Sequence, residues 1–104
     1  MFLQDYLKAR GSQFQNICEF YRVRKVYAFG SSVNGNFSTE KSDVDLIIEI
    51  EENNPITRGN KLMELWNKLE EFFQRKVDML TPNSINNPIL KESIENSKVL
   101  VYER

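Results

Sequence analysis

The sequence lacks histidine altogether, and its 104 residues include one cysteine and one tryptophan. A Ser-His-Asp or Cys-His nucleophile site needs an imidazole base, so enzymes of those classes are excluded. A structural zinc site needs about four Cys or His ligands, and Cys18 is the single candidate. One cysteine also forms no internal disulfide. Any metal bound by this chain must therefore be held mainly by oxygen atoms.

An excess of one charge and long apolar runs are missing as well. Fourteen basic residues against fifteen acidic ones give a net charge of −1, whereas proteins that grip a nucleic-acid backbone usually carry a basic excess. No apolar run approaches the ~20 residues that span a bilayer. The first residues show no basic region followed by the apolar stretch of a secretory signal. We expect a cytoplasmic protein with no membrane association and no strong nucleic-acid binding.

The hydrophobic pattern predicts one α+β domain over residues 1–104. Apolar residues at helical spacing predict a helix over 1–21 that Gly11 can bend or interrupt. Other elements are predicted as strands over 23–30, 43–50, 76–80 and 97–103, a helix over 57–74, and a last helix that begins near Pro88 with Asn87 as its cap. This order predicts a small mixed β-sheet with helices packed mainly on one face.

Some conspicuous side chains are interpreted as packing rather than chemistry. Trp66, Phe72 and Phe73 are spaced like a base-stacking platform, but their helical spacing among aliphatic residues is more typical of a core. Cys18 is interpreted as a small buried hydrophobe. The basic cluster at 22–25 is interpreted as a solvated strand end.

Two acidic residues lie close together on a predicted strand. Asp43 and Asp45 are two positions apart, so strand alternation sends both carboxylates to one face, with Cα atoms roughly 6–7 Å apart. Val44, Leu46 and Ile48 then face the other way, as a core requires. Adjacent carboxylates repel each other unless a cation lies between them. The pair therefore indicates a divalent metal, although a D-x-D sequence also occurs by chance.

A third carboxylate, Asp78, lies in the middle of the apolar segment 76–80. A charge there is costly unless it is used or paired. If this strand pairs beside residues 43–50, all three carboxylates can converge on one or two Mg²⁺ ions. The simpler explanation, taken alone, is a salt-bridged surface residue.

A glycine-serine turn precedes the carboxylates. Gly30 lets the backbone approach a ligand, and successive N–H groups after it can bind an anion. The hydroxyls of Ser31 and Ser32 add donors. A plain turn explains Gly-Ser equally well, but a turn of this kind facing metal-binding carboxylates is what phosphoryl or nucleotidyl transfer requires.

The conjunction resembles a known family. GSSVNGNFSTEKSDVDL at 30–46, followed by KVDML at 76–80, is similar to the signature of the DNA polymerase beta-type nucleotidyltransferase superfamily, and most of all to the minimal nucleotidyltransferase (MNT) domains of prokaryotes. The resemblance covers nearly the whole chain. It implies two groups of site residues, a nucleotide-binding group of Gly30, Ser31, Ser32 and Lys41, and a catalytic, metal-binding group of Asp43, Asp45 and Asp78.

The resemblance also implies an activity. It would be a Mg²⁺-dependent transfer of a nucleoside monophosphate, AMP from ATP, to a hydroxyl acceptor, with two Mg²⁺ ions expected and Asp78 helping to activate the hydroxyl. Minimal domains of this family are often antitoxins that modify a tyrosine of a helical HEPN ribonuclease toxin. A HEPN-type toxin is therefore the expected protein partner.

The chain departs from the family pattern in the loop after Gly-Ser. The loop is about one residue longer than usual, and Asn34 stands where an arginine commonly neutralises phosphate charge. Lys41 is the candidate substitute. This departure leaves a second hypothesis open, a catalytically weak or inactive domain that neutralises a protein partner by contact. A third hypothesis is a structural subunit whose acidic residues are incidental.

Overall fold

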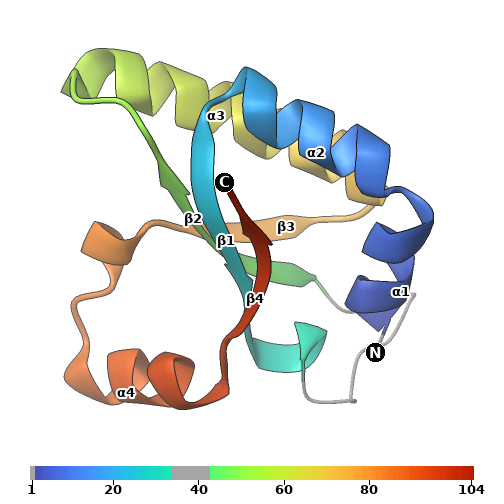
Figure 1. Ribbon diagram of the computed structural model, residues 1–104. Coiled ribbons are helices and arrows are strands. Elements are labelled where there is room, and N and C mark those ends of the chain that lie inside the picture. Colours follow the sequence, from blue (N-terminus) through green and yellow to red (C-terminus); the bar gives the residue numbers. More distant parts are fainter. Residues whose placement is uncertain (1, 34–42) are drawn as a thin grey trace.

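The computed structural model describes residues 2–33 and 43–104, and within them a four-stranded sheet is flanked by helices (Figure 1). The elements in chain order are α1 (Phe2–Ala9), α2 (Gly11–Phe20), β1 (Val23–Ala28), a 3₁₀ turn η1 (Gly30–Ser32), β2 (Val44–Ile50), α3 (Pro55–Phe73), β3 (Val77–Leu80), a second 3₁₀ turn η2 (Pro82–Ser84), α4 (Pro88–Ser97) and β4 (Val99–Glu103). No helix among the described residues is long and apolar enough to cross a membrane.

The sheet is mixed, with strand order β3-β2-β1-β4. β1 is antiparallel to both β2 and β4, whereas β2 and β3 are parallel. A parallel pair needs a crossover connection, and here α3 supplies it. The expected α+β fold is confirmed. Segment 76–80 does pair beside segment 43–50, which is the condition on which convergence of the carboxylates depends.

The core lies between one face of the sheet and helices α1, α2 and α3. Val44, Leu46 and Ile48 of β2 are at most 1% exposed and point toward these helices, as the alternation predicts. Leu65, Leu69 and Phe73 of α3 pack in the same core, and they too are at most 1% exposed. Because β2 alternates, Asp45, Ile47 and Glu49 face the opposite side of the sheet.

An asparagine side chain caps the N-terminus of α3, and another caps the N-terminus of α4. Asn54 precedes α3, and its Oδ1 accepts hydrogen bonds from the backbone N–H groups of Ile56 and Thr57. Asn87 caps α4 in the same way, as the sequence predicts. In each case a proline follows at the first helical position, where its missing N–H costs nothing.

One detail of the helices agrees with the sequence prediction and another differs from it. The helical segment is interrupted near Gly11, as the sequence allows, because Arg10 leaves the helical conformation and Gly11 begins α2. Trp66, predicted to be core, is 36% exposed, while Phe73 is 1% exposed. Its indole N–H donates a hydrogen bond to the carbonyl oxygen of Val77 at 2.8 Å, so the ring lies at the edge of the core where its polar group has a partner.

Cys18 is buried in α2, as expected, with 1% of its surface exposed. Burial raises the pKa of its thiol to about 12, and the neighbouring Glu19 carboxylate contributes. Since the thiolate is the reactive form, we expect Ellman's reagent at mildly alkaline pH to modify the folded chain roughly a thousandfold more slowly than the chain in guanidinium chloride. The reaction is followed by absorbance. Equal modification rates for the folded and the denatured chain would contradict the buried position of Cys18.

Candidate active site

The turn that begins at Gly30 lies directly against the side chain of Asp45. Gly30 has a backbone φ of +61°, in the region that favours glycine. A Cβ atom at this position would stand 2.5 Å from Oδ2 of Asp45, well inside van der Waals contact. Both the conformation and the close approach therefore require glycine here, and they place the η1 turn beside the Asp45 side chain.

Ser32 connects the turn to β2. Its hydroxyl oxygen accepts a hydrogen bond from the backbone N–H of Asp45 at 2.9 Å, and the residue is 1% exposed. The backbone N–H of Phe29 donates to the carbonyl oxygen of Asp45 at 3.1 Å. The Ser32 side chain thus continues the β1–β2 ladder by one bond after β1 ends. The structure gives Ser32 a positioning contact, and its expected contact with a nucleotide stays a prediction.

The backbone of the turn is partly used within the turn itself. The N–H of Ser32 donates to the carbonyl oxygen of Phe29, and that of Val33 donates to Gly30. Donors for an anion at this turn must therefore come from the N–H groups of Gly30 and Ser31. The turn thus offers an anion fewer backbone donors than the run of successive N–H groups that the sequence suggests.

The carboxylates of Asp45 and Asp78 are neighbours across the parallel pair. The two residues are register partners on β2 and β3, so their Cα atoms are about 5 Å apart and their side chains leave the same face of the sheet. Asp43 directly precedes β2, which begins at Val44 rather than at 43. Asp43 and Asp45 are half-buried and Asp78 is exposed.

Two side chains of α3 fix the position of Asp78. The backbone N–H of Val77, the preceding residue, donates to Oε2 of Glu70 at 3.0 Å. The Val77 carbonyl oxygen accepts the Trp66 indole N–H. Sequence reasoning missed both contacts, although an indole N–H near the core always needs an acceptor, and that was the available signal.

The donor set suits a hard cation, but it is not closed around one. In residues 2–33 and 43–104, no group of three or more His, Cys, Asp or Glu side chains is arranged to hold a metal ion. The backbone brings Asp45 beside Asp78, and carboxylate oxygens are the ligands Mg²⁺ prefers. Asp43 lies just before β2, outside the register that sets Asp45 beside Asp78.

Lys41, the predicted phosphate-binding cation, lies in segment 34–42, outside the described residues, and so does Asn34. The described structure thus brings together Gly30, Asp45 and Asp78, with Asp43 two residues upstream of Asp45.

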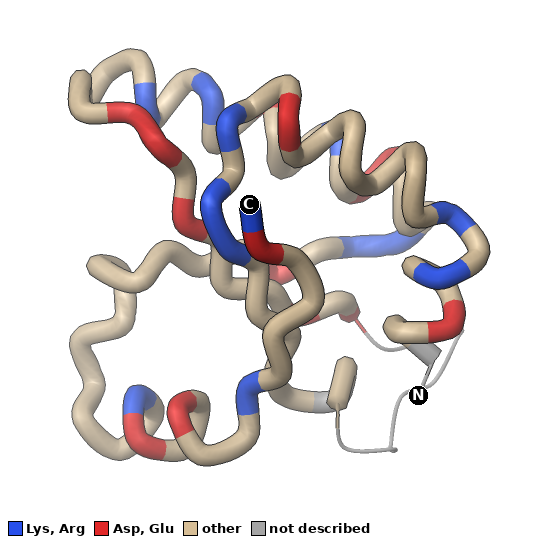
Figure 2. Tube along the Cα trace, viewed as in Figure 1, with Lys and Arg blue, Asp and Glu red and all other residues tan. Residues whose placement is uncertain are grey.

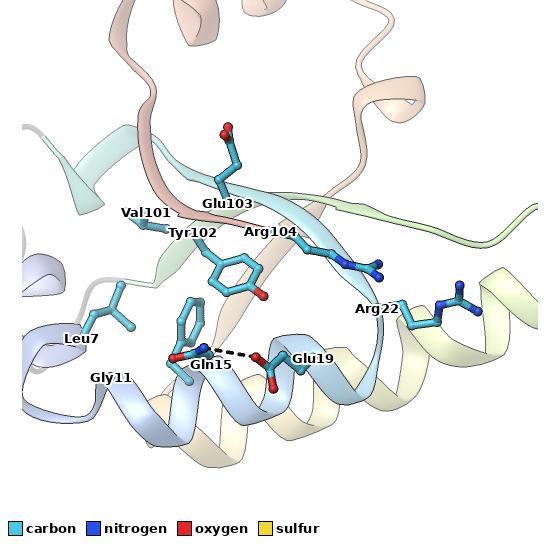
Figure 3. A pocket seen from close by; sticks show the side chains of 10 residues that line it. Leu7, Gly11, Gln15, Glu19, Arg22, Val101, Tyr102, Glu103 and Arg104 are labelled. Atoms are coloured by element: carbon cyan, nitrogen blue, oxygen red, sulfur yellow. Dashed lines mark hydrogen bonds between the residues drawn. The ribbon is translucent and has the colours of Figure 1, made fainter.

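A hollow of about 750 Å³ lies between α2 and β4, away from the carboxylates (Figure 3). The Tyr102 ring from β4 and the Gln15 and Glu19 side chains from α2 meet there, and Gln15 donates a hydrogen bond to Glu19 at 3.1 Å. Burial raises the pKa of Tyr102 above its ordinary value, and the nearby Cys18 and Glu19 add to this. This hollow is on the helix side of the sheet, so it is separate from the carboxylates.

The sequence signature of the family described as "Polymerase beta, Nucleotidyltransferase" matches residues 12–104. The chain is a member of this polymerase beta nucleotidyltransferase family. A relative from Methanocaldococcus jannaschii that carries the name protein adenylyltransferase is 42% identical over 83 residues, which cover 80% of this chain and 81% of the relative.

Two solved structures show the same nucleotidyltransferase fold. A minimal nucleotidyltransferase superposes with a TM-score of 0.69 at 24% identity, covering 92% of this chain and 93% of the other. A chain from the complex of a tri-AMPylated Shewanella oneidensis HEPN toxin with an MNT antitoxin superposes with a TM-score of 0.60 at 15% identity, covering 93% of this chain and 72% of that chain. The fold expected from the resemblance is confirmed.

Proposed function

We propose that this nucleotidyltransferase-family chain transfers AMP from ATP to a hydroxyl group on a protein partner. The observation that carries the proposal is the contact of the Gly30 turn with Asp45, which is itself the register partner of Asp78. A turn that can hold phosphates is thereby placed next to carboxylates that can hold a cation. These are the two parts that nucleotidyl transfer needs.

The relatives support the choice of acceptor. A 42% identical relative is named as a protein adenylyltransferase, and an MNT antitoxin of the same fold is found with a HEPN toxin that carries AMP groups. We infer that the partner of this chain is a HEPN-type toxin and that the acceptor is one of its tyrosines. The chain would then act as the antitoxin.

The proposed transfer is a single displacement at the α-phosphorus of ATP. The acceptor hydroxyl oxygen attacks the α-phosphorus of ATP and forms a new O–P bond, while the bond from that phosphorus to the oxygen bridging the β-phosphate breaks. Pyrophosphate leaves with the electron pair, and the hydroxyl proton passes to the Asp78 carboxylate and then to water. The Gly30 and Ser31 N–H groups, with Lys41 as a further cation, hold the phosphates.

The predicted cation is Mg²⁺, held by Asp43, Asp45 and Asp78. When bound, it would neutralise phosphate charge and lower the pKa of the attacking hydroxyl. The role of the chain is to present Asp45 and Asp78 on adjacent strands, with Asp43 just before the first of them. The hydrogen bond from the Asp45 N–H to Ser32 holds the turn against β2, and the contacts of Val77 hold β3 against α3.

The proposal is tested by incubating the chain with Mg²⁺, a HEPN-type candidate partner protein, and ATP labelled on the α-phosphate. We expect the label on the partner and none when the label is on the γ-phosphate, because pyrophosphate leaves. Mass spectrometry should place AMP on a tyrosine. Label transfer from the γ-position, or none from the α-position, would contradict the proposal.

A second candidate is a binding module that neutralises the partner without catalysis. It is favoured by one observation, that the three carboxylates do not form a closed cluster in the described structure. Calorimetry distinguishes the two: a tight complex with the partner, together with no heat from ATP and Mg²⁺, supports the binding module.

A further inference from the structure

A hollow of about 360 Å³ lies between α4 and the face of the sheet that α1, α2 and α3 leave uncovered. We call it the α4 hollow; its lining includes Tyr27, Ile47, Ile85, Lys91, Ile94 and Lys98. Figure 1 shows α4 across the sheet from α2 and α3. Ile47 is two residues after Asp45 on β2, so the floor of the hollow and the carboxylate share one face of the sheet.

The strand register shows how the Gly30 turn, Asp45 and the α4 hollow lie relative to one another. Asp45 lies opposite Phe29, next to the Gly30 turn, and Ile47 is the register partner of Tyr27. The step from Asp45 to Ile47 is about 6–7 Å. Asp45 and the start of the Gly30 turn therefore lie at the same level of the sheet, and the α4 hollow begins one alternation step further along the strands, at Tyr27 and Ile47.

In-line displacement puts the attacking oxygen and the leaving oxygen on opposite sides of the reacting phosphorus. If the leaving pyrophosphate lies at the Gly30 turn, the attacking hydroxyl comes from another side of the carboxylates, and the α4 hollow lies one alternation step from Asp45 on the same face of the sheet. We propose that the α4 hollow is the acceptor subsite and that it takes the phenol ring of a tyrosine side chain from a protein partner. This inference rests on the proposed function.

The lining suits an uncharged ring better than a phosphate. Ile47 and Ile94 are 5% and 3% exposed and form apolar walls. The Lys98 ammonium lies 4.2 Å from the centre of the Tyr27 ring and 3.0 Å from a Glu95 carboxylate oxygen. Glu49 and Glu95 line the hollow together with the two lysines, so its charges balance, and α4 carries both signs in Figure 2. An aromatic ring fits such a balanced, partly apolar hollow.

The surroundings favour an acceptor that belongs to a protein. Leu90 is one helical turn before Ile94, hence on the same face of α4, and Leu100 is the register partner of Tyr27. Both are 46% exposed. These two leucines extend the apolar surface beyond the hollow, which a folded partner can cover and a small metabolite cannot.

The binding test uses the ¹⁵N-labelled chain and two probes. Titration with N-acetyl-L-tyrosinamide at millimolar concentrations should shift the amide signals of Ile47, Ile94 and Lys98, while N-acetyl-L-serinamide should not. The α,β-methylene analogue of ATP with Mg²⁺ should instead shift the signals of Gly30 and Ser31. The two probes should bind together without competition.

A blocking variant with a matched control sharpens this test. Ile85 lines the hollow from the segment between η2 and α4, so Ile85→Trp should fill it and weaken tyrosinamide binding about tenfold or more. Ile89 is 80% exposed and does not line the hollow, so Ile89→Trp should leave binding unchanged. The response to the ATP analogue should be unchanged in both variants, which also shows that they fold.

The outcomes separate the two proposals. If the ATP analogue shifts the signals of Ile94 and Lys98 and displaces tyrosinamide, the hollow holds the nucleoside and the acceptor assignment is overturned. A response to the analogue with none to tyrosinamide overturns the acceptor assignment alone. Binding of tyrosinamide without any response to the analogue overturns the proposed transfer, and the acceptor role with it.

Discussion

Replacing Gly30 with alanine is expected to abolish AMP transfer and to destabilise the fold by about 2–4 kcal/mol. The new Cβ would lie 2.5 Å from Oδ2 of Asp45, so the carboxylate or the turn must move. The φ of +61° adds backbone strain for any residue with a side chain. Labelled-ATP transfer and chemical denaturation measure the two effects.

Gly59 is the matched control for this substitution. It lies within α3, and an added Cβ there meets nothing within 4 Å. Gly59→Ala should therefore stabilise the chain by about 0.5–1 kcal/mol through helix propensity and leave transfer unchanged. A Gly30→Ala variant with wild-type transfer would show that the turn is not part of the site.

The second large effect is expected from Asp43→Asn combined with Asp45→Asn. The change keeps the shape of both side chains but removes the charge that holds a cation, so transfer should fall about a thousandfold or more. The unfolding temperature of the wild-type chain should rise when Mg²⁺ and ATP are added, because a ligand that binds the folded state stabilises it. The double variant should lose this rise.

Glu64→Gln is the control, because Glu64 is an exposed acid on α3, outside the site. It should keep both transfer and the Mg²⁺-dependent shift in unfolding temperature. If transfer persists in the Asp43/Asp45 double variant, the assigned carboxylates are wrong, whatever happens to the partner complex.

Alternation along single strands made much of the site predictable. Period two in segment 43–50 separates Asp45 from the buried Leu46 and Ile48, and the apolar flanks of Asp78 mark a second strand. The sequence analysis made pairing of these two strands a condition for a shared site. Their parallel direction and their register are results of the structure.

Contacts between residues distant in the sequence were not predictable in the same way. The bond from Asp45 to Ser32 joins residues on either side of a long loop, and that from Trp66 to Val77 joins a helix to a strand. Neither leaves a periodic trace, since each depends on one side chain reaching one backbone group. Trp66 is the clearest example, because its helical spacing predicts a core position, whereas the ring lies at the edge of the core and its N–H donates to the Val77 carbonyl oxygen.

The crossover by α3 has a consequence for how ligand binding and folding are linked. Asp45 and Asp78 belong to strands that meet because α3 carries the chain from one to the other. If α3 opens locally, its contacts with Val77 are lost, and β3 loses the crossover that sets it beside β2. A ligand that needs both carboxylates would bind only molecules in which α3 is closed, so its binding would stabilise this helix and slow amide hydrogen exchange along it.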